Sequence, residues 1–412
     1  MKYFKRGLEA YLQKTIDSRP LVYLNGPRQC GKTTLAQNYK NGNYVSFDSP
    51  INLSAAKEDP ANFIQSLPQK KLNILDEVQT APEIFPYLKM KIDERRKNGD
   101  NTGLYLLTGS ANLMALPRLS EALVGRMSVL TLYPFSSCEI KSAEDNFILK
   151  FFENEFEYKS YKNYDVLGMI QNSTFPEPAL NSAIDRTQWY SDYLNTLLQR
   201  DIRSIADIRN PSKVIMLLSV LAMRAGGLLN NNQTAQEIGL DIKTYERYKT
   251  AAINTFIIFE IPAWAKPNNI NKRFTKASKL FFTDTNLAAY LLKRDINDIY
   301  ANDRNVMGHL FENFIATEII KNAFLMPNLE VSHFRTSDQK EVDFVLEKDG
   351  KVVGIEVKLN SSPSAHDFGG LKILKEAVGK RFKRGIVIYT GKDIVPFGDD
   401  FWAVPVCFLN GV

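Results

Sequence analysis

Residues 26–33, with the sequence GPRQCGKT, have the residue types and spacing of a loop that binds nucleotide phosphates. Glycines at positions 26 and 31 allow the backbone to wrap closely around phosphate groups, and Lys32 supplies a positive charge. The loop follows the apolar run 21–24 and precedes a helical pattern, which is the order that a P-loop requires. The predicted nucleotide-binding residues are Gly26, Pro27, Arg28, Gln29, Cys30, Gly31, Lys32, Thr33, Thr34 and Ser110.

Two acidic residues at the end of a second apolar run add hydrolytic chemistry to this phosphate site. The segment KLNILDEVQ ends its apolar run at Asp76 and Glu77. We expect Asp76 and the Thr33 hydroxyl to hold Mg²⁺, and Glu77 to orient and activate a water against the γ-phosphate. A third run, GLYLLTGSAN, ends in Thr108 and Ser110, which are suited to sensing that phosphate. These residues predict ATP and Mg²⁺ as cofactors and ATP hydrolysis as the reaction.

Phosphoryl transfer is faster when an additional positive charge stabilises its transition state. Arg126 is the candidate for this charge. It would act on the nucleotide of its own chain or on that of a neighbour in a homo-oligomer. The alternative for Arg126 is a structural salt bridge beside the glycine turn at position 125. Arg28 and Arg118 are substitutes for the catalytic role.

A second group of charged residues lies near the end of the chain, in the segment EVDFVLEKDGKVVGIEVKLN. Asp349-Gly350 has the signature of a two-residue hairpin turn, and this register places Asp343 directly opposite Glu356. Facing carboxylates are destabilising unless a cation bridges them or one of them takes up a proton. With Glu312 arriving from a helix, we expect Glu312, Asp343 and Glu356 to hold Mg²⁺ and Lys358 to orient or deprotonate the attacking water.

This arrangement is similar to the core of the PD-(D/E)xK nucleases. The resemblance implies a restriction-endonuclease-like domain and a Mg²⁺-dependent centre that cleaves phosphodiester bonds. Such cores can lose cutting and retain binding, so an inactive domain is the alternative.

The segment from Asn210 to Trp264 predicts a winged helix-turn-helix, with three helices followed by a strand. Lys243, Tyr245, Arg247 and Lys249 are expected on the outward side of the third helix, where a DNA groove could meet them. A protein-interaction or spacer module is the alternative reading, because such folds often lose DNA contact.

The elements that position these residues indicate an α/β protein. Apolar runs that end in polar residues, separated by helical stretches, predict a parallel sheet with its site at the carboxyl ends of the strands. A helical and winged-helix part and a C-terminal α/β part follow. We expect a P-loop ATPase domain at residues 1–140, a helical linker and winged-helix domain at 141–285, and a nuclease-like domain at 286–412.

Length and composition agree with this division. A chain of 412 residues with 44% hydrophobic and 24% charged residues reads as a globular protein of two or three domains. Its net charge of +6 is compatible with a polyanionic partner but does not demonstrate one. The three cysteines lack metal or disulfide spacing, and we found no signal peptide or membrane-spanning run. We therefore expect a cytoplasmic protein without membrane contact.

The chain resembles a group of bacterial and archaeal AAA-type ATPases whose C-terminal half is a domain of unknown function. The matching pieces are GPRQCGKTT, LDEVQ, LTGSAN, LYPFS, FPEP, YLNTLLQRDI, GHLFENFIATEI and the hairpin, and they spread from about residue 20 to about residue 360. Ser173-Thr174 departs from the glycines that usually precede the FPE element. The resemblance implies ATP hydrolysis and a role for Arg200 and Asp201 in fixing the domain junction.

Together these features predict an ATP-hydrolysing protein that acts on DNA, with a nuclease centre at its C-terminus. The alternative is a nucleotide-operated regulatory switch or scaffold, with an inactive nuclease-like domain and a protein partner.

Overall fold

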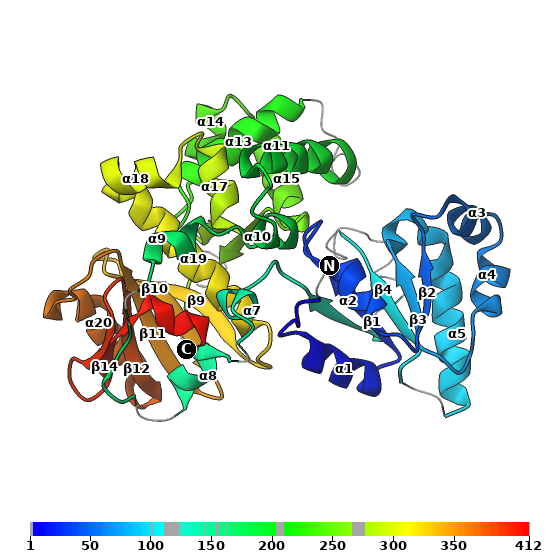
Figure 1. Cartoon of the computed structure of the whole chain (residues 1–412), viewed down its shortest axis with the longest axis horizontal. Coiled ribbons are helices and arrows are strands. Elements are labelled where there is room, and N and C mark those ends of the chain that lie inside the picture. Colours follow the sequence, from blue (N-terminus) through cyan, green and yellow to red (C-terminus); the bar gives the residue numbers. More distant parts are fainter. Residues whose placement is uncertain are drawn as a thin grey trace.

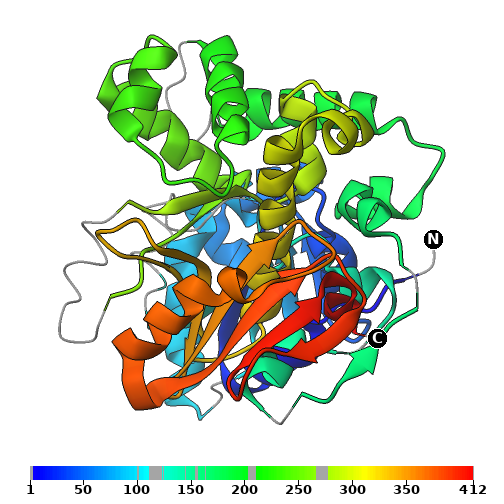
Figure 2. The same ribbon diagram turned by 90° about the vertical axis from the view of Figure 1, so that its left-hand side faces the viewer.

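The computed structural model describes residues 3–99, 102–110, 123, 125–143, 145–153, 156–162, 164–202, 210–265 and 277–411. The N-terminal sheet with its helices stands to one side of the molecule in Figure 1, and the helical middle region and the C-terminal sheet lie together on the other side. Figure 2 shows the C-terminal sheet, in orange and red, with green helices of the middle region above it. We use "middle region" for residues 141–285 and "C-terminal region" for residues 286–412.

The N-terminal sheet has five parallel strands in the order β2-β3-β4-β1-β5. The strands are β1 (Leu21–Asn25), β2 (Asn43–Ser46), β3 (Asn73–Asp76), β4 (Tyr105–Thr108) and β5 (Met127–Thr131). The helices of this part are α1 (Glu9–Ser18), α2 (Lys32–Gln37), α3 (Pro50–Glu58), α4 (Pro60–Ser66) and α5 (Phe85–Lys97), with short 3-10 turns at Val78–Thr80 and Pro82–Ile84.

Parallel pairing brings the carboxyl ends of these strands to one edge. Leu24 of β1 is level with Thr108 of β4, and Ser46 of β2 is level with Asp76 of β3. β1, β3 and β4 are buried along their whole length, as their apolar sequences predict. The predicted α/β fold, with the polar residues gathered at this edge, is confirmed.

The middle region is mostly helical. It starts with α8 (Phe147–Phe152), the short strand β6 (Lys159–Ser160), α9 (Val166–Gln171) and α10 (Pro176–Leu180), after α7 (Ser137–Ile140) at the junction with the N-terminal part. Helix α11 (Arg186–Thr196) continues into a π-helical turn at Leu197–Ile202. Three helices and an antiparallel strand pair follow, which is the order of a winged helix: α13 (Pro211–Met223), α14 (Asn231–Glu237), α15 (Ile242–Asn254), β7 (Ile258–Ile261) and β8 (Lys279–Phe282).

The C-terminal region begins with α17 (Thr285–Leu291), α18 (Ile296–Asn302) and the long helix α19 (Arg304–Ala323). Its mixed sheet has seven strands in the order β6-β13-β14-β12-β11-β10-β9. The strands are β9 (Glu330–Arg335), β10 (Glu341–Lys348), β11 (Lys351–Lys358), β12 (Phe382–Tyr389), β13 (Asp393–Pro396) and β14 (Phe401–Pro405). Helix α20 (Gly369–Val378) packs on β10, β11 and β12, and short 3-10 turns lie at Ala365–Phe368, Gly379–Arg381 and Val406–Asn410.

The β10–β11 hairpin has the register that its turn predicts. Phe344 pairs with Ile355, and Lys348 pairs with Lys351. Asp349 and Gly350 form the turn with φ values of 49° and 76°, as a two-residue turn with two positive φ angles requires.

The largest apolar core does not stop at residue 285. One cluster of buried side chains runs from Phe147 to Leu409 and includes Phe281 of β8 and Phe344 of β10, whose ring centroids are 5.7 Å apart. The isolated bridge Ala263–His333 joins the segment after β7 to β9. The middle and C-terminal regions therefore share a core, and the division at 285 stays a prediction.

Across the described ranges, no helix combines the length and the apolar character needed to cross a bilayer.

Candidate nucleotide site and C-terminal carboxylate cluster

The loop between β1 and α2 has the backbone conformation of a phosphate cradle. Gly26, Gln29 and Gly31 have φ values of 144°, 61° and 100°. A Cβ at position 26 would lie 2.1 Å from the Leu132 carbonyl oxygen, so this position requires glycine. The Lys32 ammonium is buried in the loop and donates to the carbonyls of Gly26, at 3.0 Å, and Pro27, at 2.7 Å.

Asp76 receives three hydroxyl groups at the edge of the sheet. Its Oδ2 accepts from Thr33 Oγ1 at 2.9 Å and from the Tyr44 hydroxyl at 2.6 Å, and its Oδ1 accepts from Thr108. Burial, together with Asp76, raises the pKa of Tyr44 to about 12, so this phenol stays a donor. Thr33 and Asp76 are hard oxygen donors in direct contact, and they fit a Mg²⁺ ion that is shared with nucleotide phosphates.

Glu77 follows Asp76 in a left-handed conformation, with φ of 59°. Burial raises the pKa of Glu77, against the lowering effect of Lys32. The Gln79 side-chain amide donates to the Glu77 carboxylate and, at 3.3 Å, to Ser110 Oγ. Gln79 thus connects the predicted base to the predicted phosphate sensor. Tyr44 and Gln79 were absent from the predicted site, although Gln79 lies within the LDEVQ motif.

The remaining loop residues differ in what they offer a ligand. The Cys30 side chain is buried, donates to the Leu132 carbonyl at 3.1 Å and accepts from Lys32 Nζ at 3.9 Å. Thr34 is exposed on α2. Arg6 also contacts the loop, since its Nη1 donates to the Cys30 carbonyl at 2.9 Å. The sequence did not reveal this contact, because Arg6 lies in a separate segment before α1.

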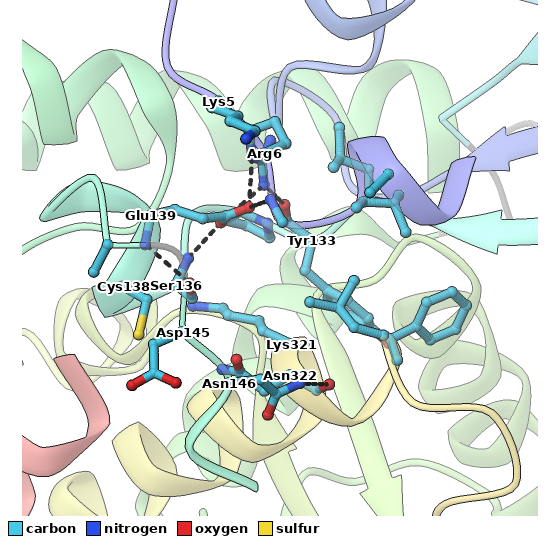
Figure 3. A pocket seen from close by; sticks show the side chains of 18 of the residues that line it. Lys5, Arg6, Tyr133, Ser136, Cys138, Glu139, Asp145, Asn146, Lys321 and Asn322 are labelled. Carbon is cyan, nitrogen blue, oxygen red and sulfur yellow. Dashed lines mark hydrogen bonds and ion pairs between the residues drawn. The ribbon is translucent and has the colours of Figure 1, made fainter. Parts of the chain in front are cut away.

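Arg6 also forms one wall of a cavity of about 590 Å³ between the ATPase part and α19. Figure 3 shows Arg6 directed at Glu139, with Lys321 and Asn322 of α19 on the opposite side. The distance from Arg6 Nε to Glu139 Oε1 is 3.0 Å, and Arg6 Nη2 donates to the Tyr133 carbonyl at 2.6 Å. The predicted hydrolytic residues do not line this cavity, which meets the P-loop through Arg6 and Leu132.

Asp201, from the π-helical turn of the middle region, reaches the P-loop. Arg28 Nε lies 2.9 Å from Asp201 Oδ2, and Arg28 Nη2 lies 3.3 Å from Asp201 Oδ1. Ser110 Oγ donates to the same carboxylate at 3.5 Å. Pro176 of α10 is a second neighbour from the middle region, since a Cβ on Gly31 would lie 3.9 Å from its Cγ. The predicted nucleotide site therefore lies at the junction of the two parts.

Arg126 is not at this site. It forms a two-point ion pair with Asp93 of α5, at 2.7 and 2.8 Å. Arg126 precedes β5, and Met127 is level with Leu21 at the amino end of β1, whereas the P-loop follows the carboxyl end. The expectation that Arg126 acts on the nucleotide of its own chain is therefore wrong, and the alternative of a salt bridge beside the turn at Gly125 is what the structure contains. Arg118 lies outside the described residues.

The predicted metal site of the C-terminal region contains a lysine. Lys279 Nζ of β8 lies 2.8 Å from Glu312 Oε1 and 2.8 Å from Asp343 Oδ1. Asp343 Oδ2 accepts from the Val357 backbone N–H at 2.9 Å. Burial alone would lower the pKa of Lys279, but Asp343 and Glu312 raise it above its ordinary value. Lys279 is therefore a permanent cation.

Glu356 is paired with Lys358, whose Nζ lies 2.8 Å from Glu356 Oε1. Burial, followed by the Asp343 charge, raises the pKa of Glu356 to about 8. In the part of the chain that the structure describes, no three His, Cys, Asp or Glu side chains are arranged to hold a metal ion. The expected Mg²⁺ ligands Glu312, Asp343 and Glu356 thus do not fit a divalent cation in this arrangement, because the Lys279 ammonium occupies the space between Glu312 and Asp343. Glu356 Oε2 is buried without a hydrogen-bond partner among the described residues. The role predicted for Lys358 stays a prediction, because its contact with Glu356 neither supports nor contradicts it.

The third helix of the predicted winged helix, α15, presents fewer groups than expected. Asp241 caps it by accepting from the Thr244 N–H at 3.0 Å. Lys243 and Arg247 are exposed. Tyr245 is fully buried and donates to Asn231, so its expected outward position is wrong. Lys249 is turned toward β7, where it pairs with Glu260 at 2.9 Å.

Comparison with known families divides the chain into three matched segments. Residues 18–141 match the AAA domain family, residues 166–298 match a domain of unknown function, DUF8612, and residues 307–409 match another, DUF4143. With the P-loop geometry described above, the AAA match shows that the N-terminal part is an AAA-type P-loop ATPase domain.

Relatives extend over nearly the whole chain. An uncharacterized protein of Mycobacterium tuberculosis is 27% identical over 97% of this chain and 83% of its own length. An uncharacterized protein of Haemophilus influenzae is 23% identical over 93% of both chains. These relatives carry no functional description.

Solved structures resemble the chain only loosely. A variant of Thermotoga maritima RuvB covers 62% of this chain and 87% of its own, with 19% identity and a TM-score of 0.30. The Aeropyrum pernix ORC1 protein, solved in complex with DNA, covers 74% of this chain and 94% of its own, with 13% identity and a TM-score of 0.29. At these TM-scores neither structure carries an argument about the function of this chain.

Proposed function

We propose that this protein hydrolyses ATP at its P-loop, that the nucleotide state changes the contact between the ATPase domain and the middle region, and that the middle region engages DNA. The observation that carries the proposal is the position of Asp201, which binds both Arg28 of the P-loop and Ser110 of the predicted phosphate sensor.

The hydrolytic step uses residues at the carboxyl edge of the sheet. A bound Mg²⁺ would neutralise charge on the β- and γ-phosphate oxygens. Thr33 and Asp76 would supply oxygen ligands for it, and Lys32 would exchange its two carbonyl partners for the phosphates. Glu77 orients the attacking water and accepts its proton, and burial makes this carboxylate a better proton acceptor.

The coupling step depends on competition for Arg28 and Ser110. Both groups can donate to phosphate oxygens, and both now donate to Asp201. Nucleotide binding would draw them away from the carboxylate and weaken the hold of the ATPase domain on the π-helical turn. Because this turn precedes α13 in the chain, the change reaches the predicted winged helix.

DNA engagement would use the exposed groups Lys243 and Arg247 on α15. A helix that follows a short turn in this way can enter a DNA groove and contact phosphates with its basic side chains. The positive net charge of the chain favours the same class of partner.

A second function is favoured by the structure of α15 itself. Tyr245 is buried and Lys249 is paired with Glu260, which leaves two of the four expected contact residues for DNA. The alternative is therefore a nucleotide-operated switch in which the middle region binds a protein.

The test compares ATP turnover and duplex DNA binding in three proteins. The double substitution Lys243→Ala with Arg247→Ala removes the α15 charges, and Lys57→Ala with Lys70→Ala removes two exposed charges from the ATPase domain as a matched control. We expect the wild type and the control to bind DNA in a salt-dependent way and to change ATP turnover when DNA is added, and the α15 variant to do neither. Equal behaviour of both variants, or no DNA binding by the wild type, would reject the DNA role in favour of the protein-binding switch.

ATP turnover without DNA tests the enzyme assignment separately. Lys32→Ala should abolish it, and normal turnover by that variant would reject ATP hydrolysis at the P-loop.

A further inference from the structure

Lys279 brings together three elements that are distant in the chain. It is the first residue of β8, and its side chain is 4% exposed. Its ammonium lies 2.8 Å from Glu312 of α19 and 2.8 Å from Asp343 of β10. The amine therefore occupies the space between two of the three carboxylates that a divalent cation would need.

The backbone holds this lysine in place from two directions. Lys279 pairs with Ile261 of β7, and it forms a bridge to Leu228 in the loop before α14. The next three residues, Leu280, Phe281 and Phe282, are fully buried in the shared core. The backbone of Lys279 is therefore fixed, and the ammonium is held by its contacts with Glu312 and Asp343.

Further contacts surround the carboxylates of the cluster. A Cβ at Gly226 would lie 3.0 Å from Glu312 Oε2, so the loop backbone closes against this carboxylate. The second oxygen of Asp343 accepts from the Val357 N–H, and Glu356 Oε1 accepts from Lys358. Glu356 Oε2 is buried without a hydrogen-bond partner among the described residues. A cation entering from solvent would have to displace the buried Lys279 ammonium from both Glu312 and Asp343.

We infer that the ammonium of Lys279 is the resident cation of the Glu312 and Asp343 carboxylates, and that the C-terminal region keeps a nuclease-like hairpin without binding a divalent metal there. This inference does not depend on ATP hydrolysis or on DNA binding. It assigns the cluster a structural role, in which one ion bridge joins the β7–β8 hairpin, α19 and the β10–β11 hairpin.

The decisive experiment counts bound Mn²⁺ by electron paramagnetic resonance in the full chain without nucleotide. Wild type is compared with Glu312→Gln, which removes a predicted metal ligand, keeps its shape and leaves Lys279 paired with Asp343. We expect the same number of bound Mn²⁺ ions in both proteins. Loss of one bound ion per chain in Glu312→Gln would overturn the inference.

A second pair of variants tests whether the lysine itself excludes the metal. Lys279→Met leaves two uncompensated carboxylates, and we expect it to melt at a lower temperature than the wild type. Added Mn²⁺ should raise that temperature in Lys279→Met, and it should raise it much less in Lys279→Met combined with Asp343→Asn. If Lys279→Met does not fold, the comparison of the wild type with Glu312→Gln decides the question alone. The inference would be refuted if Mn²⁺ raised the melting temperature of the wild type but not that of Glu312→Gln.

Discussion

Asp201 of the middle region and Arg28 of the P-loop form a two-point ion pair, with nitrogen to oxygen distances of 2.9 and 3.3 Å. The two residues are far apart in the sequence, and the pair joins the phosphate-binding loop to the π-helical turn that leads into α13. It is the contact through which a nucleotide could act on the rest of the chain.

A double-mutant cycle should detect this pair. We expect Arg28→Gln and Asp201→Asn to be coupled by roughly 0.5 to 3 kcal/mol in the free energy of unfolding, because contacting charged residues are not independent. The coupling should shrink when a non-hydrolysable ATP analogue and Mg²⁺ are present. Urea unfolding curves measure both quantities. Asp192→Asn on the exposed side of α11 is the control. If the changes in unfolding free energy of Arg28→Gln and Asp201→Asn simply add in the absence of nucleotide, the pair does not join the two parts.

Replacement of Glu77 tests the proposed general base. Glu77→Gln should lower kcat for ATP hydrolysis by about 10²- to 10⁴-fold, because a positioned base contributes a factor of that size. ATP affinity should change little, since the phosphates are held by the loop. Steady-state phosphate release and fluorescent ATP binding measure the two effects. Glu83→Gln, an exposed neighbour, should match the wild type, and a Glu77→Gln enzyme of normal kcat would remove Glu77 from the mechanism.

Arg126 should matter little for catalysis. Its partner Asp93 is more than one third exposed, so Arg126→Ala should reduce the unfolding free energy by less than about 1 kcal/mol. We expect ATP turnover within about twofold of the wild type at high protein concentration, since a residue that supplies transition-state charge would cost about 10³-fold or more. A loss of that larger size would instead assign Arg126 to the nucleotide of a neighbouring chain.

Glu318 of α19 should make the stability depend on pH. It is fully buried, its Oε2 accepts from the Ser137 N–H at 2.9 Å, and burial raises its pKa above the ordinary value of 4.5 despite Lys321. A carboxyl group whose pKa is raised on folding binds more protons in the folded state. Its contribution is therefore fully present below pH 4.5 and is lost as the pH rises through the folded value.

The measurement is the difference in unfolding free energy between the wild type and Glu318→Gln across this pH range. We expect the wild type to lose stability relative to Glu318→Gln as the pH rises from about 4.5 toward neutrality. A difference that stays constant with pH would contradict the raised pKa. Glu376→Gln on α20 serves as the exposed control.

Local spacing was sufficient to predict the P-loop, the acidic pair after β3 and the register of the hairpin. Each of these depends on neighbours in the sequence, such as the two glycines of the loop or the turn at Asp349-Gly350. The edge strand β5 was missed because it is only partly buried, and its polar residues Ser128 and Thr131 interrupt the apolar run.

The residues that sequence reasoning missed are those brought in by tertiary packing. Lys279 reads as the start of a strand, and nothing in its neighbourhood reveals two carboxylates that lie 33 and 64 positions away. Arg6 and Tyr44 likewise reach the site from separate elements. Tyr245 was placed outward with Lys243 and Arg247, although residues two positions apart lie on nearly opposite sides of a helix. Its i, i+3, i+7 spacing with Tyr248 and Ala252 puts it on the buried face of α15.

The core that runs from Phe147 to Leu409 has a consequence for how the chain comes apart. Strand β6 is the outermost strand of the C-terminal sheet although it lies before α9 in the chain, and Ile394 pairs with Lys159 there. A polypeptide ending after β8 would lack the partners of β6, of Phe281 and of Lys279 at once. The middle and C-terminal regions should therefore melt as a single cooperative unit, and neither half should survive proteolytic separation from the other.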